Sequence, residues 1–169
     1  MNYISKVLES DLLFVIKPYE LTKEELINLI KSHPEIKFLS LMGIDLSGND
    51  TDEKIPIKNF LDNADEFLSG GIQTDGSSVV LPGIATLNNA KVDIVADLES
   101  NWFVDYNFEF LDSTLGKPVG TLRIPSFLYH SGKAVDSRSI LKRAVDTFCN
   151  RLMKLIKENP NLLEGTGIE

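Results

Sequence analysis

Apolar residues recur at helical spacing in the segment 21–34, LTKEELINLIKSHP. Thr22 and Glu25 have the spacing of a capping box, in which each side chain satisfies a backbone amide of the other residue. Leu26, Leu29 and Ile30 then share one face, as expected of an amphipathic helix. The residue before a proline is pushed out of helical dihedral angles. The pattern therefore predicts a helix that begins at Thr22 and ends at His33-Pro34.

The segment 136–160 carries a longer helical pattern. Asp136 or Ser137 can cap its amino end, and Pro160 closes it. Lys154 and Lys157 lie near the carboxyl end, where positive charge favours the helix dipole. Eight apolar residues fall on one face over about five turns: Ile140, Leu141, Ala144, Val145, Phe148, Leu152, Leu155 and Ile156. We expect one long amphipathic helix.

Between the two helices, the pattern favours strands. The stretch 36–45 is rich in branched and aromatic residues and leads into the turn 47–49, which predicts a hairpin whose return strand is 54–57. Pro56 is expected near a sheet edge, where its missing amide does least harm. A second short helix is expected over 57–68, stopped by the glycines of 69–71.

Further strands are predicted at 92–99, around Phe108 and Phe110, and at 119–124 after a turn at 116–118. Strands around one or two helices indicate an α+β fold.

Composition narrows the function classes. The chain of 169 residues has a net charge of −8 and no apolar run of the roughly 20 residues that span a bilayer. Its N-terminus does not read as a signal peptide, because Glu9, Ser10 and Asp11 interrupt the apolar stretch. Acidic charge without a clustered basic face argues against nucleic acid binding. A single cysteine fits a reducing cytoplasm, where we expect the protein.

Few side chains suggest chemistry by themselves. Cys149 lies within the apolar pattern of the long helix and is interpreted as a small packing residue rather than a nucleophile. His33 and His130 are far apart in sequence and lack neighbours at ligand spacing, so no metal site is expected from this chain. The basic residues of the long helix are interpreted as a solvated face, with an anion-binding patch as the less favoured alternative.

The heptapeptide QTDGSSV, residues 73–79, is the exception. Asp75, Gly76, Ser77 and Ser78 suit a plain surface turn, because Asp and Ser bind nearby backbone amides and Gly accepts a positive φ. The same atoms could serve a ligand. The local chemistry alone leaves both interpretations open and favours the turn.

Three motifs in order shift this balance. They are the D-G-S-S loop from Asp75 to Val79, the acidic strand D-x-V-x-x-D over Asp93 to Asp97, and the segment 132–144, in which Gly132 stands four positions before the start of DSRSILKRA. Together they resemble the amino-terminal region of the glutamine synthetases. The resemblance covers roughly residues 36–144.

The sequence departs from the family pattern in several places. Ala96 stands where the family often has a proline before the acidic residue, and the segment from the loop to Asp93 is longer. Ser137 stands where the family usually has a proline, and Val80-Leu81-Pro82 replaces the glycines and tryptophan that commonly follow the loop. A divergent member is therefore expected, whose substrate is glutamate or another amino acid or amine.

The resemblance implies a β-grasp-like mixed sheet with one or two packed helices, followed by a hairpin and the long helix. The predicted divisions are an N-terminal extension over 1–20, a β-grasp domain over 21–112, and a segment over 113–169 that leads to a catalytic domain. In the family, the active site lies between the β-grasp domain of one subunit and the catalytic domain of its neighbour. The complete enzyme therefore implies a homo-oligomer that uses ATP with Mg²⁺ or Mn²⁺.

The resemblance assigns Asp75 to the ammonium site and Ser78 to the same site, as the candidate catalytic residues, with Gly76 and Ser77 shaping the substrate-binding loop. A carboxylate attracts ammonium and, when partly desolvated, can help to remove its proton.

The family's metal-binding glutamates and ATP pocket follow the long helix, so this chain is not expected to catalyse the ligation or to bind a cofactor alone. Two hypotheses remain. The chain either supplies half of a shared ligase site, or it is a stand-alone interaction module that docks on a synthetase or another partner as a regulator.

Overall fold

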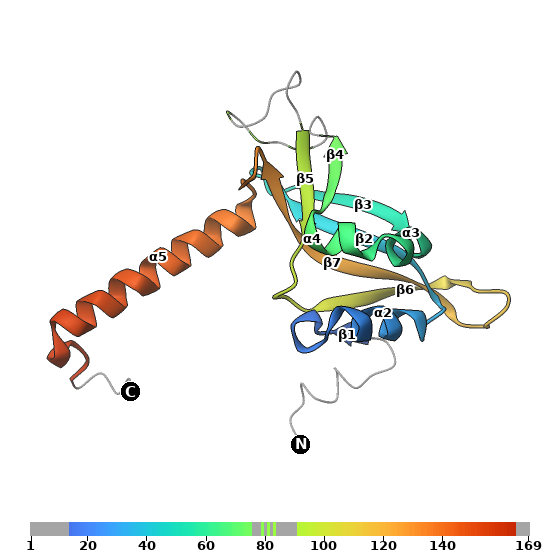
Figure 1. Ribbon diagram of the computed structural model, residues 1–169, viewed down its shortest axis with the longest axis horizontal. Helices are drawn as coiled ribbons and strands as arrows, with labels where there is room; N and C mark the ends of the chain where they lie inside the picture. Colours follow the sequence, from blue (N-terminus) through green and yellow to red (C-terminus); the bar gives the residue numbers. More distant parts are fainter. Residues whose placement is uncertain (1–13, 76–78, 80, 82, 84–90, 165–169) are drawn as a thin grey trace.

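The computed structural model describes residues 14–75, 79, 81, 83 and 91–164. Figure 1 shows a sheet with helices packed on one side and a long helix that leaves the sheet. In chain order the elements are β1 (Phe14–Ile16), η1 (Pro18–Glu20), α2 (Lys23–Lys31), β2 (Ile36–Ile44), β3 (Asp50–Pro56), α3 (Ile57–Asp62), α4 (Ala64–Ser69), β4 (Ile72–Asp75), β5 (Lys91–Ala96), β6 (Trp102–Leu111), β7 (Pro118–His130), β8 (Lys133–Ala134), α5 (Ser137–Glu158) and η3 (Pro160–Leu163).

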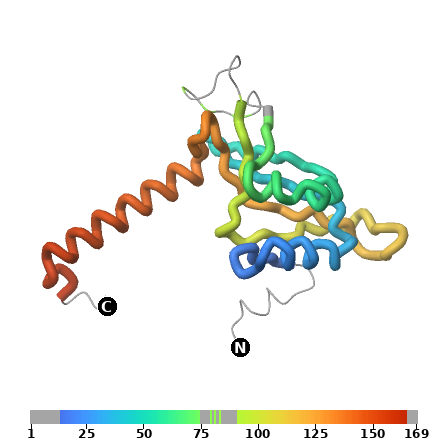
Figure 2. Tube along the Cα trace, in the orientation of Figure 1, coloured from blue at the N-terminus to red at the C-terminus, as the bar shows by residue number. Residues whose placement is uncertain are grey.

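Strand β7 organises the sheet. The main path of the sheet is β1-β6-β7-β2-β3, in which β2 and β7 are parallel and the other pairs are antiparallel. The second half of β7 pairs with β5 and β8, and β5 pairs with β4. Figure 2 follows this path along the chain and shows β7 crossing the sheet. The mixed sheet with its packed helices is the α+β, β-grasp-like fold that the sequence predicts.

Several predicted boundaries differ from the structure: the strand predicted at 92–99 ends at Ala96, and two differences lie in the first half of the chain. The predicted second helix, 57–68, is two short helices, because Asn63 takes φ −130° and ψ 32°, outside the helical region. The return strand of the first hairpin begins at Asp50 rather than at residue 54. Gly48 occupies the turn with φ +85°, and β3 forms the sheet edge at which Pro56 was expected.

The sheet draws strands from both sides of the range 21–112 that was predicted for the β-grasp domain. Strand β1 precedes this range and β7 follows it, yet both belong to the main sheet. The sequence predicts only the part of β7 over 119–124, because the full length of a strand of 13 residues depends on partners that lie elsewhere in the sequence. The division of the chain into domains stays a prediction.

One core fills the space between the sheet and the helices α2, α3 and α4, which two perpendicular views place on the same side. From the helices it receives Leu26, Ile30, Phe60 and Ala64. From the strands it receives Ile16, Ile36, Leu39, Leu41, Val92, Ile94, Ala96, Trp102, Val104, Leu122, Ile124 and Leu128. The alternate positions of the strands point to the other face. There Arg123 binds Asp52 at 2.7 Å and Asp105 at 3.2 Å.

The predicted capping signals are confirmed. Thr22 and Glu25 form both halves of the capping box of α2. Asp136 caps α5 through Oδ1, which accepts a hydrogen bond from the amide of Ser139 at 2.7 Å. Ser137, the alternative cap, instead donates its hydroxyl to the carbonyl of Asp45 at 2.6 Å. A proline, usual here in the family that the sequence resembles, has no hydroxyl to make this bond.

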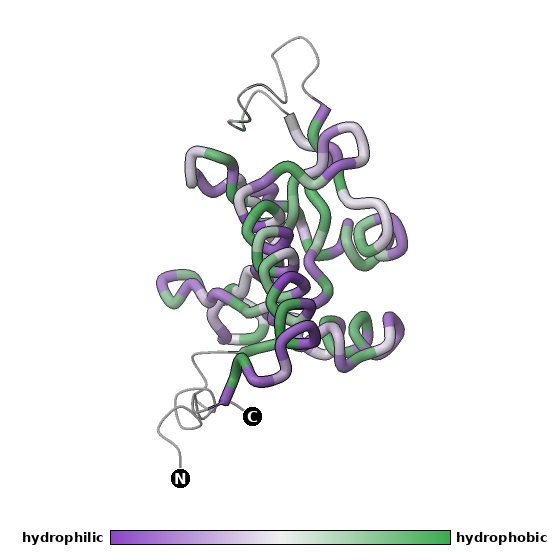
Figure 3. Tube along the Cα trace, turned by 90° about the vertical axis from the view of Figure 1, so that its left-hand side faces the viewer, coloured by the Kyte–Doolittle hydropathy of each residue, from purple (hydrophilic) through white to green (hydrophobic). Residues whose placement is uncertain are grey.

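Helix α5 exposes its apolar face. Leu141 and Phe148 are each 65% exposed, and Val145 is 50% exposed. Figure 3 shows the helix with apolar and polar residues alternating along its length. Among the described residues, no helix is long and apolar enough to cross a membrane.

Candidate functional site

The candidate loop begins at one end of the sheet. Asp75 is the last residue of β4, and its backbone lies opposite Lys91, the first residue of β5. Of the four residues proposed for the ammonium site, Gly76, Ser77 and Ser78 lie outside the described residues. The structure therefore places the backbone of Asp75 at the sheet end and leaves the meeting of Asp75 with Ser78 as a prediction.

Both sides of the loop are anchored. Before it, Thr74 is buried, and its hydroxyl donates to the carboxylate of Glu53 in β3. After it, Val79 and Leu81 belong to the buried core, with exposed fractions of 7% and 2%. Buried side chains on either side hold the ends of a connection in place, because removing them from the core would expose apolar surface. Thr74 and Val79, the described residues on either side, are thus fixed to the rest of the fold.

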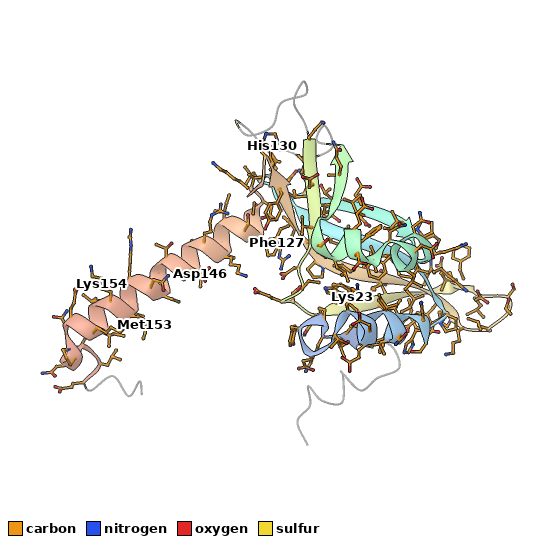
Figure 4. All side chains as sticks on the ribbon, in the orientation of Figure 1. Lys23, Phe127, His130, Asp146, Met153 and Lys154 are labelled. Carbon is orange, nitrogen blue, oxygen red and sulfur yellow. The ribbon has the colours of Figure 1, made fainter. Side chains whose placement is uncertain are left out.

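A histidine joins this end of the sheet from β7. His130 Nδ1 lies 2.9 Å from the carbonyl oxygen of Lys91 and is the donor, because a carbonyl only accepts. Lys133 of β8 pairs with His130 in the sheet register. The ends of β4, β5 and β7 therefore lie side by side, and Figure 4 shows His130 at this end of the molecule.

The pattern of residues did not single out this position of His130. The sequence shows only a polar residue at the end of a long strand. Its position beside Lys91 depends on the register between β7 and β5, which a single sequence does not contain.

The second and third motifs meet at the base of α5. Asp97, directly after β5, binds Arg138 in the first turn of α5, with 2.6 Å between Asp97 Oδ2 and Arg138 Nη2. Asp136 is fully buried, and its Oδ2 accepts a hydrogen bond from the amide of Leu128 at 2.9 Å. These residues thus form a junction between the sheet and α5.

This junction is separate from the candidate loop. Asp75 lies opposite the first residue of β5, whereas Asp97 follows its last residue. Six residues of extended chain between Lys91 and Asp97 correspond to about 20 Å. Asp75 therefore lies at the sheet end, near the turn that contains Gly132, whereas Asp97 and Arg138 belong to the junction.

Apolar hollows flank the same junction. One, of about 280 Å³, is lined by Asp97, Phe127, Arg138 and the first turns of α5, including Leu141 and Val145. The hydrogen bond to Glu99 raises the pKa of Lys142, which also lines this hollow, above its ordinary value. Lys142 is thus a charged neighbour of an open, partly apolar surface.

The described residues contain no group of three or more metal-binding side chains. His33 instead pairs with Glu35 at 2.9 Å, at a position in the α2–β2 connection, and its ring stacks on Phe14. Cys149, interpreted from the sequence as a packing residue, is exposed on α5.

No family model matches this sequence, and no curated protein matches it significantly. Solved structures do match. The cryo-EM structure of Plasmodium falciparum glutamine synthetase aligns over 78% of this chain with a TM-score of 0.55 and 18% identity.

Two structures of a protein named GmaS also match, one described as an ADP complex and one as free of ligand. Their TM-scores are 0.48 and 0.44, their identities 19% and 16%, and they cover 72% and 64% of this chain.

The chain spans about a quarter of each of these proteins: 23% of the Plasmodium falciparum enzyme and 26% and 22% of the two GmaS chains. The comparison concerns the fold, because all the identities lie below 20%. The chain thus shares its fold with part of a glutamine synthetase, as the resemblance in its motifs predicts.

Proposed function

We propose that this chain is the amino-terminal portion of a glutamine synthetase-like, ATP-dependent ligase, and that it supplies the loop beginning at Asp75 to an active site shared with a neighbouring subunit. The observation that carries the proposal is the position of Asp75. It is the last residue of β4, at the end of a sheet whose fold is shared with part of a glutamine synthetase. A loop that starts at a sheet end can project toward another subunit.

The proposed role of Asp75 follows from its charge. A carboxylate attracts ammonium, and the attraction grows when a neighbouring subunit covers the site and excludes water. The same carboxylate can accept a proton from ammonium, which frees the nitrogen lone pair for attack on an activated acid. An asparagine at this position would lose both effects. Ser78 would orient the carboxylate or donate to the ligand, while Gly76 and Ser77 shape the loop.

ATP would supply the activation of the acid, and Mg²⁺ or Mn²⁺ would accompany it. The described residues offer no cluster of carboxylates and histidines for such a cation. In this proposal those groups come from the catalytic part of the ligase, and the present chain contributes the nucleophile's side of the site. The acid substrate is glutamate, or another amino acid with a matching carboxylate.

The test is the variant Asp75→Asn in the assembled ligase. We expect the rate of amide formation to fall by about 100-fold or more, in the range of a lost general base, while the affinity for ATP changes little. The matched control is Asp62→Asn, which changes an exposed carboxylate at the end of α3 and should leave the rate unchanged. A rate for Asp75→Asn within about twofold of the parent would contradict the proposal.

A second candidate function rests on the exposed apolar face of α5. A surface of this kind normally packs against another protein or domain. The chain would then be an interaction module that regulates a synthetase by docking on it. In that case the isolated chain should co-elute with a full-length synthetase at micromolar concentration and change its activity, and Asp75→Asn should have no effect on that change.

A further inference from the structure

In the part of the chain that the structure describes, helix α5 is attached to the sheet through its first two turns. Among the described residues, hydrogen bonds and ion pairs between the sheet and the helix come from positions 136–143. Figure 4 shows Asp146, Met153 and Lys154 along the part that extends away from the sheet. The direction of a 22-residue helix is therefore set by contacts at one of its ends.

One set of contacts fixes where the helix starts. The buried carboxylate of Asp136 accepts hydrogen bonds from the amides of Leu128 and Ser139. The preceding turn contains Ser131 and Gly132, both with positive φ, at 50° and 74°. A single point of attachment holds a rod in place but leaves its direction free, so a second point is needed to fix the direction.

Arg138 provides this second point. Its Nη2 donates to Asp97 Oδ2 at 2.6 Å, and its Nη1 donates to the carbonyl of Ser126 at 3.2 Å. The guanidinium also lies over the ring of Phe127, 4.8 Å from its centre. A planar guanidinium with three partners in different directions has little freedom to rotate.

The partner of Arg138 is itself held rigidly. The carboxylate of Asp97 is 8% exposed. Its backbone amide donates to the carbonyl of Pro125 at 2.8 Å, and its carbonyl accepts from the indole of Trp102, a fully buried residue, at 2.9 Å. The position of Arg138 is thus tied to the core of the sheet domain.

The next contact along the helix differs in kind. Lys142 pairs with Glu99 at 2.5 Å, but the two side chains are 50% and 77% exposed. Exposed ion pairs of this type contribute little, because water screens them and both side chains lose freedom. Arg138 and Lys142 therefore offer a matched comparison, one anchored in the core and one on the surface. The hydrogen bond from Arg143 Nη1 to the carbonyl of Ala134 at 2.9 Å is kept when either residue is replaced.

We propose that Arg138 is the positioning residue that sets the angle between α5 and the sheet. The attachment of α5 to the sheet through Arg138 is called the joint below. Without the contacts of Arg138 to Asp97 and Ser126, α5 would swing about its amino end while the sheet stays folded. This joint does not depend on the proposed function. Its catalytic consequence rests on that function, because the angle then determines where the loop after Asp75 lies relative to whatever follows the helix.

The joint can be tested in the full 169-residue chain by measuring a distance. Cys149 is the single cysteine and is exposed on α5, so it can carry one spin label. A second cysteine, Ser113→Cys, places the other label in the exposed turn between β6 and β7. Pulsed electron paramagnetic resonance then gives the distribution of distances between helix and sheet.

We expect Arg138→Met to widen this distribution by about twofold or more, since α5 gains freedom to move against the sheet. Lys142→Met should leave the width near that of the parent, and Arg138→Lys, which keeps the charge but not the planar fork, should lie between them. Trp102 fluorescence reports whether the sheet domain stays folded in each variant.

Equal widths for Arg138→Met and the parent would overturn the proposal, as would a Lys142→Met variant that widens the distribution equally. If Arg138→Met does not fold, Arg138→Lys and Asp97→Asn provide the comparison, and parental widths in both overturn it. The measurement needs no catalytic activity. A widened distance distribution in Arg138→Met, together with full activity of the Asp75→Asn ligase, would therefore support the role of Arg138 and contradict the proposed function.

Discussion

At the residue scale, the carboxylate of Asp112 in the β6–β7 turn is bound through both of its oxygens. Its Oδ2 lies 2.8 Å from Lys37 Nζ, and its Oδ1 accepts hydrogen bonds from the amides of Thr114 and Leu115. The hydrogen bond from Lys37, followed by those from the two amides, lowers the pKa of Asp112 from 3.8 to about 2. All three donors favour the charged form.

A lowered pKa fixes the sign of the pH dependence. The unfolded chain takes up the proton near pH 3.8, whereas the folded chain resists it until about pH 2. The stabilisation from Asp112 is therefore fully present above pH 3.8 and is lost as the pH falls toward 2.

We predict that the carboxyl group of Asp112 titrates near pH 2 in the parent and at a higher pH in Lys37→Met, because that variant removes the largest cause of the shift. Carboxyl chemical shifts measured by NMR during acid titration test this. Lys58→Met, a change in α3, is the control and should not alter the titration. An unchanged midpoint in Lys37→Met would show that the two amides alone hold the charge.

At the element scale, the two glycines between α4 and β4 differ in what they permit. Gly71 has φ +74°, and a Cβ there would lie 2.6 Å from the carbonyl oxygen of Ile94 and 2.6 Å from Val95 Cγ2. Gly70 has φ −116°, and a Cβ there would approach only the carbonyl of Glu66, at 3.5 Å. Only the second glycine is therefore required, where the chain leaves α4 and passes close to β5.

We predict that Gly71→Ala lowers the free energy of unfolding by about 2 kcal/mol or more, through backbone strain and overlap with β5. Gly70→Ala should change it by less than about 1 kcal/mol. Urea denaturation followed by Trp102 fluorescence measures both. Equal effects of the two substitutions would mean that the close approach to Ile94 relaxes at little cost.

The same elements show what a single sequence can predict. The limits of α2 and α5 follow from residues within a few positions, such as Thr22, Glu25 and Asp136, and were predicted closely. The break at Asn63 carries no proline or glycine and was missed. The full length of β7 also escaped prediction, because its central position follows from pairing with β2, β5 and β6.

The candidate site, too, could be predicted from the sequence only in part. Asp75 was identified through a resemblance, since the local residues also suit an ordinary turn. The contact between Asp97 and Arg138 joins residues 41 positions apart, and no local pattern predicts which acidic residue an arginine will meet. Motif order indicated that both residues matter, and the fold showed that they meet each other.

At the scale of the whole molecule, charge is unevenly distributed. Helix α5 holds six of the 17 basic residues and two of the 25 acidic ones, which gives it a net charge of +4 against −12 for the rest of the chain. Its apolar face is exposed over the same length. A surface that is both apolar and basic favours association with surfaces that are apolar and acidic. The rest of this chain carries an excess of acidic charge, so copies of the chain can attract one another.

We predict that the isolated chain associates as its concentration rises, and that Phe148→Glu reduces this association by removing a 65% exposed aromatic ring from the apolar face. The control Asn150→Glu adds the same charge at an exposed polar position of α5. Sedimentation velocity over a range of concentrations measures both variants. Equal reduction by the two would attribute the effect to charge rather than to apolar surface.

The parallel pair formed by β2 and β7 has a consequence for how the chain is made. Ser40 and Arg123, partners in this pair, are 83 positions apart. During synthesis from the amino end, β2 is finished long before its neighbour exists, and β1 also waits for β6. Pairings between such distant segments form slowly, and unpaired strands are exposed meanwhile. The ribosome must therefore complete β7 before this sheet can close, and until then β3 is the strand available to pair with β2.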